Sequence, residues 1–246
     1  MRPIDKGAIP IDNGVAKTVS THRSWRRNLI DRLGAYCCYC NMRLNDSPQV
    51  EHVIAQDIDA NRSLDWDNVI LACGPCNRTK SNRQCPPTTH YLPEYHNTHL
   101  AFDYFVSSQK NHGEPAAYIR PHQQYIDIVK ANNTIDLCAL DRDTTRTFDQ
   151  ATDLRWKYRF ETMVRALILR DELEEWPYIN LHGFIKFLKM IVEATGFWSI
   201  WYETFIDVLE IRRMLVMDFA GTDQHSFDST TFLPIPRTPR HAGDSI

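Results

Sequence analysis

The sequence has no long apolar run. None of its 246 residues lies in a stretch near the ~18 consecutive apolar residues that span a bilayer, so we expect no membrane span. Residues 1–7 also lack the apolar segment of a secretory signal, so we expect a cytoplasmic protein. The hydrophobic fraction of 43% and the charged fraction of 24% are ordinary for a folded chain, which argues against disorder.

The sequence also lacks a strong net charge. The formal value of −3 gives no general electrostatic argument for binding nucleic acid. The distribution is less even, because residues 1–83 hold 12 Lys/Arg against 9 Asp/Glu, which leaves the excess of acid in residues 84–246. A basic front that meets phosphate and an acidic back that meets a protein fit this asymmetry, and so do solvated faces of random sign.

Seven cysteines in a reducing compartment favour a metal site over disulfides. Four of them form the pairs Cys37/Cys40 and Cys73/Cys76, and C-x-x-C pairs suit tetrahedral Zn²⁺. The 32 residues between the pairs exceed the usual spacing of about 15 to 20, so a segment is inserted between them. With four protein ligands such a zinc is structural. Free buried thiols are the alternative, and Cys38 could replace Cys37.

The front of the chain predicts an arm, a helix and a hairpin. Residues 1–35 form an arm and then a helix over 21–34, with Thr21 as its cap and Gly34 at its end. Apolar residues within 49–55 and 67–72 predict two strand arms, and a helix opening at Asn77 follows them.

The back of the chain predicts mostly helix. Residues 85–99 are rich in Pro, His and Tyr, which is typical of a linker or a wrapping loop, and residues 221–246 have the composition of a flexible tail. Between them, residues 100–220 form a second unit. Its expected elements are a strand over 134–140, a helix from Asp153 with Leu154, Tyr158, Val164 and Ile168 on one face, a helix ending at Gly196, and a helix from Ser199.

The candidates for chemistry lie on the inserted segment and just after the second cysteine pair. Glu51 offers a carboxylate, His52 a base and Asn77 an amide oxygen. Carboxylate and amide oxygens suit a hard ion such as Mg²⁺ or Mn²⁺. Adjacent strand residues point to opposite sides, so Glu51 and His52 can serve one site only on a distorted strand.

The cysteine pairs, the Val50-Glu51-His52-Val53 run and the stretch from Trp66 to Lys80 together resemble the HNH, or ββα-metal, endonucleases. The resemblance implies His52 as the base that activates water, Glu51 and Asn77 as ligands of a divalent metal, and Asn68 as the residue that orients the base. It also implies phosphate contact by Lys80, to which we add the neighbouring Arg78. Two departures stand out: Asp is commoner than Glu at position 51, and Asn77 replaces the third letter, His.

The predicted fold class is therefore α+β: a zinc-stapled ββα-metal (HNH) nuclease module at 36–84, followed by a mostly helical C-terminal domain. A wider resemblance, which includes the opening residues 1–7 and the run 134–137, is to the PtuB-type nucleases of Septu and retron-linked anti-phage systems. It implies a PtuA-type ABC/SMC-like ATPase as partner in a larger hetero-oligomer. Residues 100–220 are then the expected docking domain.

Two alternatives stay open. The first is a zinc-binding adaptor that recognises nucleic acid or protein without cutting it, which the weak basic charge and the Asn at the third letter favour. The second keeps the nuclease and changes the substrate from DNA to RNA, for instance a tRNA, because the expected site residues contact a phosphate and not a sugar.

Overall fold

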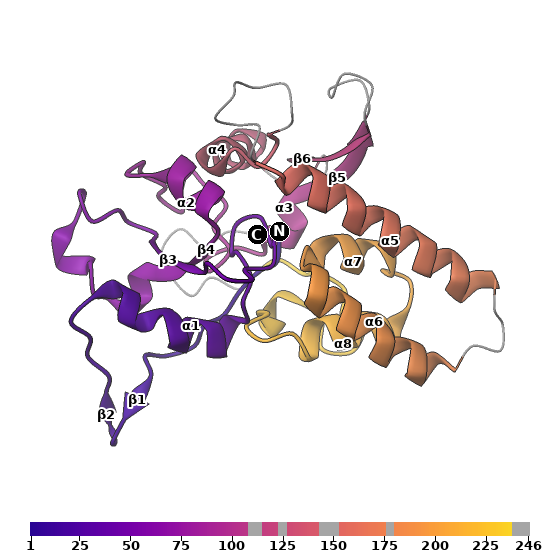
Figure 1. The fold of residues 1–246 in the computed structure, drawn as a ribbon, viewed down its shortest axis with the longest axis horizontal. Helices are drawn as coiled ribbons and strands as arrows, with labels where there is room; N and C mark the ends of the chain where they lie inside the picture. Colours follow the sequence, from indigo (N-terminus) through magenta and orange to yellow (C-terminus); the bar gives the residue numbers. More distant parts are fainter. Residues whose placement is uncertain (108–114, 123–126, 143–152, 176–179, 238–246) are drawn as a thin grey trace.

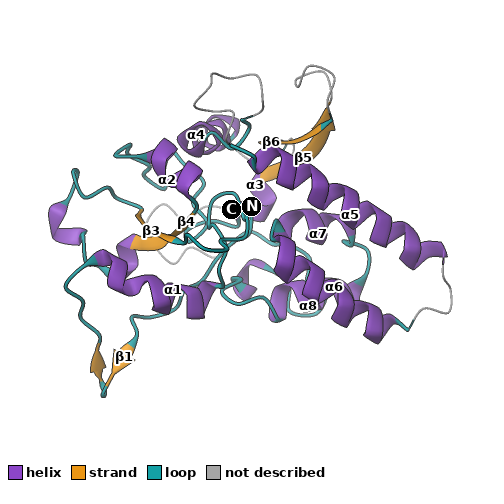
Figure 2. Cartoon of the chain, viewed as in Figure 1, coloured by secondary structure: helices purple, strands orange, loops and turns teal. Residues whose placement is uncertain are grey.

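The computed structural model describes residues 1–107, 115–122, 127–142, 153–175 and 180–237. Short strands and short helices make up the first half, and longer helices dominate the second (Figures 1 and 2). The strands are β1 (Ile11–Asp12), β2 (Val15–Ala16), β3 (Gln49–His52), β4 (Val69–Ala72), β5 (Phe102–Ser107) and β6 (Ala116–Pro121). The helices are α1 (Arg26–Leu33), α2 (Gly74–Lys80), α3 (Thr98–Ala101), α4 (Ile128–Cys138), α5 (Arg155–Glu175), α6 (Leu181–Thr195), α7 (Trp198–Thr204) and α8 (Leu209–Met217), with 3₁₀ turns η1 (His22–Trp25), η2 (Ala60–Arg62), η3 (Trp66–Asn68) and η5 (Gln224–Ser226).

The strands pair two by two, all antiparallel: β1 with β2, β3 with β4, and β5 with β6. In the β3–β4 pair Glu51 lies opposite Ile70 and His52 opposite Val69, and α2 begins two residues after β4 ends. The predicted hairpin and the helix after it are therefore present. The β1–β2 ribbon projects from the body beside α1 (Figure 1).

Three hydrophobic clusters lie inside the described part of the chain, of which the third is small and joins Ala116 and Tyr118 to Trp156. The first contains α1, both cysteine pairs and the β3–β4 pair, and it continues past Leu100 to Phe102, Ile135 and Leu140. Tyr91 and Leu92 are buried in it, so the segment expected as a linker wraps onto this cluster. The second cluster is built by α6, α7 and α8. The first cluster thus contains residues from both sides of residue 100, where the second unit was expected to begin.

The strand expected over 134–140 is wrong, because Ile128–Cys138 is the helix α4. Asp127 caps it by accepting a hydrogen bond from the Lys130 backbone N–H at 3.0 Å. Its buried residues recur at helical spacing, which overrides the strand preference of a β-branched run; they are Lys130, Ala131, Thr134, Ile135, Leu137 and Cys138.

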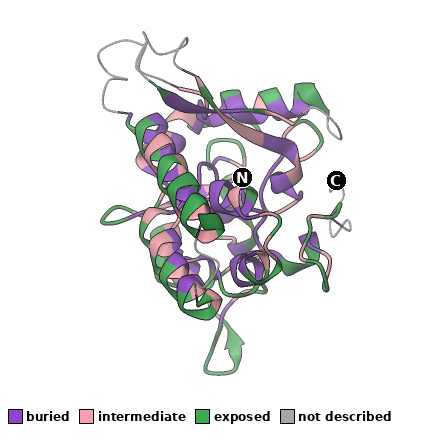
Figure 3. Cartoon of the chain, turned by 90° about the vertical axis from the view of Figure 1, so that its right-hand side faces the viewer, coloured by how far each residue is buried: buried purple, intermediate pink, exposed green. Residues whose placement is uncertain are grey.

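The helix expected from Asp153 is present as α5, but the predicted buried face is wrong. Leu154, Tyr158, Val164 and Ile168 are exposed, and the face that packs inward carries Arg155, Trp156, Arg159, Thr162 and Ala166 (Figure 3 draws the burial along the chain). The hydrophobic stripe does not predict the buried face of α5, because Arg155 and Arg159 are buried on the other face. Carbonyl and carboxylate groups accept their hydrogen bonds there.

Glycines end two of the helices as predicted. Gly34 follows α1 at φ 72°, and Gly196 follows α6 at φ 73°, a region that side chains with a Cβ rarely adopt. Thr21 precedes η1 without a side-chain capping bond, so its predicted role as cap is wrong. The helix expected from Ser199 begins at Trp198 and is two helices, α7 and α8, separated at residues 205–208.

The first six residues run through the middle of the molecule. The Arg2 guanidinium donates to the carbonyl of Leu33 at 2.8 Å and to that of Ala220 at 3.0 Å. Residues 221–237 pack beside residues 1–6, and the buried Asp223 and Arg237 form an ion pair there at 3.1 Å. The described part of the expected tail is therefore folded onto the body. Residues 238–246 lie outside the described residues.

Candidate active site and metal centre

The four predicted cysteines meet in one buried cluster. Sulfur atoms of Cys37, Cys40, Cys73 and Cys76 all lie within 4.8 Å of one another. Cys40 and Cys73 have a sulfur separation of 3.7 Å. A tetrahedral Zn²⁺ with Zn–S bonds of about 2.3 Å separates its sulfurs by about 3.8 Å, so the cluster has the size and the donor set for zinc. The prediction of a four-cysteine cluster that can hold a metal ion is confirmed.

The structure also resolves which cysteine of the first pair belongs to the cluster. Cys38 is outside it, and its backbone N–H donates to the Leu71 carbonyl at 2.9 Å. Burial raises the pKa of the Cys38 thiol to about 12, which keeps it protonated. Cys37 is therefore the member of the cluster.

Arg155 reaches this cluster from α5, a contact that sequence reasoning missed. Its Nη1 donates to the sulfur of Cys76 at 3.0 Å and to the Cys138 carbonyl at 3.0 Å. Asp153 accepts from the same guanidinium at 2.7 Å. A cation at a thiolate stabilises the charged form that binds metal. Because 79 residues separate Arg155 from Cys76, no local spacing could have paired them.

The second cysteine pair also begins α2. The backbone N–H of Cys76 donates to the Cys73 sulfur at 3.4 Å, so Cys73 acts as the N-cap. The helix starts at Gly74, three residues before Asn77, so the expectation that Asn77 opens it is wrong.

Glu51 and Lys80 form a buried ion pair between β3 and α2. The Lys80 ammonium lies 2.9 Å from the Glu51 carboxylate and donates to the His52 carbonyl at 2.7 Å. Lys80 is 0% exposed and faces Glu51, so this arrangement gives no support to its contact with substrate phosphate, which stays a prediction. Burial raises the pKa of the Glu51 carboxyl to about 7, and Lys80 offsets only part of that rise.

Asn77 makes a second side-chain contact between β3 and α2. Its amide Nδ2 donates to Gln49 Oε1 at 2.8 Å, one strand pleat away from the Glu51–Lys80 pair. Of the expected ligands of a catalytic Mg²⁺ or Mn²⁺, Asn77 contacts Gln49 through its amide nitrogen and not through the oxygen that would bind the ion. Glu51, by contrast, already has a cation as its partner. These two residues do not form a ready ligand set for a second metal.

His52 lies on the opposite side of β3 from Glu51, as the alternation of an undistorted strand requires. The half-buried ring places Nε2 at 2.9 Å from the Ser63 carbonyl. A carbonyl oxygen only accepts, so Nε2 carries the hydrogen and donates it. The other nitrogen, Nδ1, then has the lone pair that a general base needs.

Asn68 holds together the loop that faces His52. Its Oδ1 accepts from the Ile54 backbone N–H at 2.7 Å, and its Nδ2 donates to the carbonyls of Ile54 and Arg62 at 2.9 and 3.0 Å. The loop between these carbonyls and β4 includes Ser63, the partner of His52. Asn68 thus bonds to Arg62, the residue next to Ser63, whose carbonyl orients the His52 ring. The effect of Asn68 on catalysis stays a prediction.

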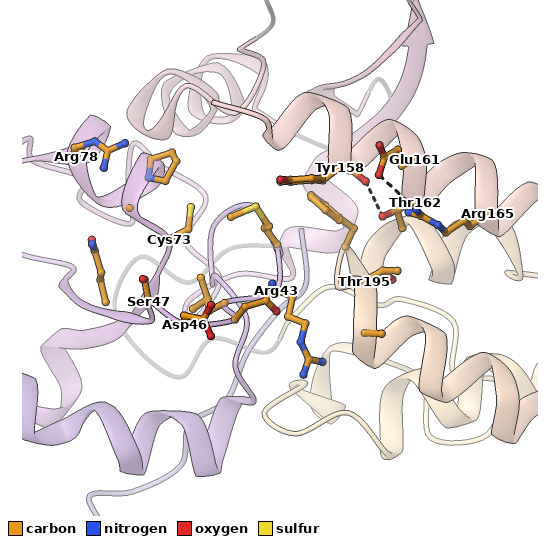
Figure 4. Close-up of a pocket in the computed structure, with 18 residues that line it drawn as sticks. Arg43, Asp46, Ser47, Cys73, Arg78, Tyr158, Glu161, Thr162, Arg165 and Thr195 are labelled. Atoms are coloured by element: carbon orange, nitrogen blue, oxygen red, sulfur yellow. Dashed lines mark hydrogen bonds and ion pairs between the residues drawn. The ribbon is translucent and has the colours of Figure 1, made fainter. Parts of the chain in front are cut away.

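A large cleft lies between the cysteine cluster and the C-terminal helices. Its volume is about 850 Å³. Figure 4 shows Cys73 and Arg78 on one side of it and Tyr158, Glu161 and Arg165 of α5 on the other. Arg78 is exposed, so it stays available for the phosphate contact predicted for it. Neither Glu51 nor His52 lines this cleft.

Residues 36–83 match the family model described as HNH endonuclease. The matched segment contains the whole cysteine cluster, the β3–β4 pair and α2, and it coincides closely with the expected module at 36–84. The chain therefore carries an HNH endonuclease domain, which indicates nuclease activity. No curated protein and no solved structure matches the chain. No helix in the described ranges is long and apolar enough to cross a membrane.

Proposed function

We propose that this protein is an endonuclease that hydrolyses phosphodiester bonds in nucleic acid, with His52 as the general base. The observation that carries the proposal is the hydrogen bond from His52 Nε2 to the Ser63 carbonyl, which leaves Nδ1 free to accept a proton. This residue lies within the HNH endonuclease domain.

The proposed reaction uses that geometry as follows. Nδ1 of His52 takes a proton from water while the water oxygen bonds to phosphorus and the bond from phosphorus to the leaving oxygen breaks. The leaving oxygen takes a proton from solvent. A positioned base of this kind contributes about 10²- to 10⁴-fold in rate. The Ser63 contact fixes the ring and its tautomer before substrate arrives.

In our proposal, Zn²⁺ held by the four cysteines would stabilise the fold around His52 and would take no part in the reaction. Four protein sulfurs close the coordination shell, so the ion supplies folding energy and no open site for substrate. The cluster joins the start of α2 to the loop before β3, and it thereby holds the β3–β4 pair that carries His52.

A divalent ion such as Mg²⁺ or Mn²⁺ remains part of the proposal through the family resemblance. For Glu51 and Asn77 to bind it, Glu51 has to release Lys80, whereas the amide oxygen of Asn77 takes no part in the bond to Gln49. We therefore assign no reaction step to this ion.

The biological setting is proposed on the PtuB resemblance alone. In this proposal the protein acts in bacterial anti-phage defence, DNA is its favoured substrate, and a PtuA-type ABC/SMC-like ATPase docks on the C-terminal helices. Exposed apolar side chains on α5 and α6, such as Ile168 and Met190, are compatible with such docking.

The second candidate function is a non-catalytic zinc-binding adaptor. The observation that favours it is the buried ion pair of Glu51 with Lys80, which occupies the carboxylate expected to bind the metal. An adaptor needs the zinc site but not the base. It predicts that binding of nucleic acid or protein survives His52→Ala and Glu51→Ala, with no turnover under any divalent ion.

The test is cleavage of plasmid DNA, single-stranded DNA and tRNA by the zinc-loaded protein, with Mg²⁺ or Mn²⁺ and with or without the candidate ATPase. We expect turnover on at least one substrate, loss of turnover in His52→Ala, and none of that loss in His225→Ala, an exposed histidine of η5. Equal turnover by wild type and His52→Ala refutes the role of His52. Binding without turnover on every substrate favours the adaptor, and cleavage of tRNA alone selects the ribonuclease.

A further inference from the structure

A second histidine lies against His52. The ring of His22 has its centroid 4.7 Å from that of His52, with the two planes at 57°. His22 belongs to η1, which lies outside the matched HNH segment. Both rings are half-buried, so each keeps an edge toward solvent.

His22 also lines a cavity beside the His52 contact. The cavity has a volume of about 570 Å³. The segment from Ser20 to Arg23 forms one wall, and Gln56, Ser63 and Leu64 form the other. Ser63 is the residue whose carbonyl holds His52, so the cavity opens next to the proposed base. Six of its seven lining residues carry side chains that can hydrogen-bond, and Arg23 among them is a cation, which gives a charged ligand its partners.

The charge around this cavity is positive. Arg23 and Arg26 are exposed, and no ion pair to either occurs among the described residues. Both guanidiniums act on His22: its pKa is lowered first by burial, and then by His52, Arg23 and Arg26. A phosphate that enters the cavity therefore meets a neutral imidazole, which can donate one hydrogen bond, and the Arg23 cation in the cavity wall, while Arg26 is near enough to act on His22.

We propose that η1 and the first residue of α1 form the phosphate-binding wall of the reaction centre. In this arrangement His22 donates a hydrogen bond to an oxygen of the phosphate that His52-activated water attacks, and Arg23 and Arg26 bind the flanking phosphates of the same strand. The ligand class is the backbone of a polynucleotide, read without base contacts. The inference rests on the proposed function and adds to it the substrate contacts outside the HNH domain.

Arg27 is the matched control. It lies on the same helix and is exposed, but it pairs with Asp31 at 3.0 Å and has no resolved effect on His22. Arg27→Ala removes one positive charge from the same region, but not one of the two that lower the pKa of His22. Comparison with Arg23→Ala and Arg26→Ala therefore separates position from net charge.

Binding is measured on the zinc-loaded protein in buffer without Mg²⁺ or Mn²⁺, by fluorescence anisotropy of a labelled 20-nucleotide single strand across a salt series. Each lost phosphate contact lowers the magnitude of the slope of log K against log salt by about 0.7 for a single strand. We expect this change in Arg23→Ala and in Arg26→Ala, a change near twice as large in the double variant, and none in Arg27→Ala. Equal slopes in wild type and the double variant overturn the assignment of the two arginines.

Cleavage tests His22. Loss of one hydrogen-bond donor to the transition state lowers the rate by about 100-fold, so we expect that loss in kcat of His22→Ala, with KM changed less. Zinc content and the unfolding midpoint equal to those of wild type show that the variant is folded. Unchanged kcat in His22→Ala beside an inactive His52→Ala overturns the role of His22 and leaves the proposed function standing. If the wild type does not cleave, the proposed function fails, and the binding series still decides whether the wall holds phosphates.

Discussion

Replacement of Arg155 by methionine should weaken zinc binding without touching a zinc ligand. The guanidinium is 2% exposed and donates at 3.0 Å to the sulfur of Cys76. It also donates to the carbonyls of Cys138 and Ala139 and pairs with Asp153 at 2.7 Å. Methionine keeps an unbranched apolar stem and removes every one of these bonds. The variant therefore tests whether α5 supports the metal centre.

The size of the effect follows from those contacts. Loss of an outer partner of a metal ligand typically lowers metal affinity by about 10- to 100-fold, or about 1.4 to 2.7 kcal/mol. Removal of one member of a buried ion pair costs about 3 to 5 kcal/mol of folding free energy, because Asp153 is left without its main cation. The double variant Arg155→Met/Asp153→Asn should recover part of the folding loss and none of the zinc loss.

The assay is competition for Zn²⁺ between the protein and a chromogenic chelator, read as the chelator–zinc absorbance. Arg159→Met is the matched control, since Arg159 is one turn along α5, equally buried, and donates to the carbonyls of Ala117 and Leu140 but, among the described residues, to no cysteine sulfur. We expect both variants to lose stability and only Arg155→Met to lose zinc affinity. Equal zinc affinity in the two variants refutes the reasoning.

Three further predictions follow from single contacts. Glu51 holds its proton more tightly in the folded chain, with a pKa of about 7 against an ordinary value of 4.5, so this term stabilises the fold fully below pH 4.5 and is lost as the pH rises through 7. The free energy of unfolding in urea, taken as wild type minus Glu51→Gln, should therefore fall by about 3 kcal/mol between pH 4.5 and 8. A difference that does not change with pH contradicts the argument that burial raises the pKa of Glu51. A Cβ at Gly196 would lie 2.6 Å from the Asn41 carbonyl oxygen, so Gly196→Ala should cost about 2 kcal/mol or more, whereas Gly14→Ala, with φ +79° and open space around it, should cost about 1. Removal of zinc by a strong chelator should raise amide hydrogen exchange in α2 and β4 before it does so in α7, and uniform exchange across these elements counts against a local role of the metal.

Sequence reasoning succeeded where a local pattern has one physical solution. Two C-x-x-C pairs can share one metal, and they do meet in one cluster. Gly34 and Gly196 stand at helix ends because the backbone there has positive φ. The hairpin arms and the helix after them follow from short apolar runs framed by the cysteines.

It failed where a distant partner decides the outcome. Arg155 and Arg159 turn inward because carbonyls from residues 117 and 138–140 receive them, and this reverses the expected face of α5. From the sequence we expected Lys80 at the surface, but its ammonium is buried because it pairs with the Glu51 carboxylate. The ring contact between His22 and His52 joins an N-terminal turn to the HNH domain, and no spacing of 30 residues predicts it.

The central claim is that His52 is the base of a nuclease, and chemical rescue tests it most directly. The measurement is the cleavage rate of His52→Ala with and without added imidazole, on whichever substrate the wild type cleaves. We predict a rate at least about 100-fold below wild type that imidazole partly restores, because a free base then replaces the missing Nδ1. A His52→Ala protein that cleaves as fast as wild type without imidazole contradicts the account.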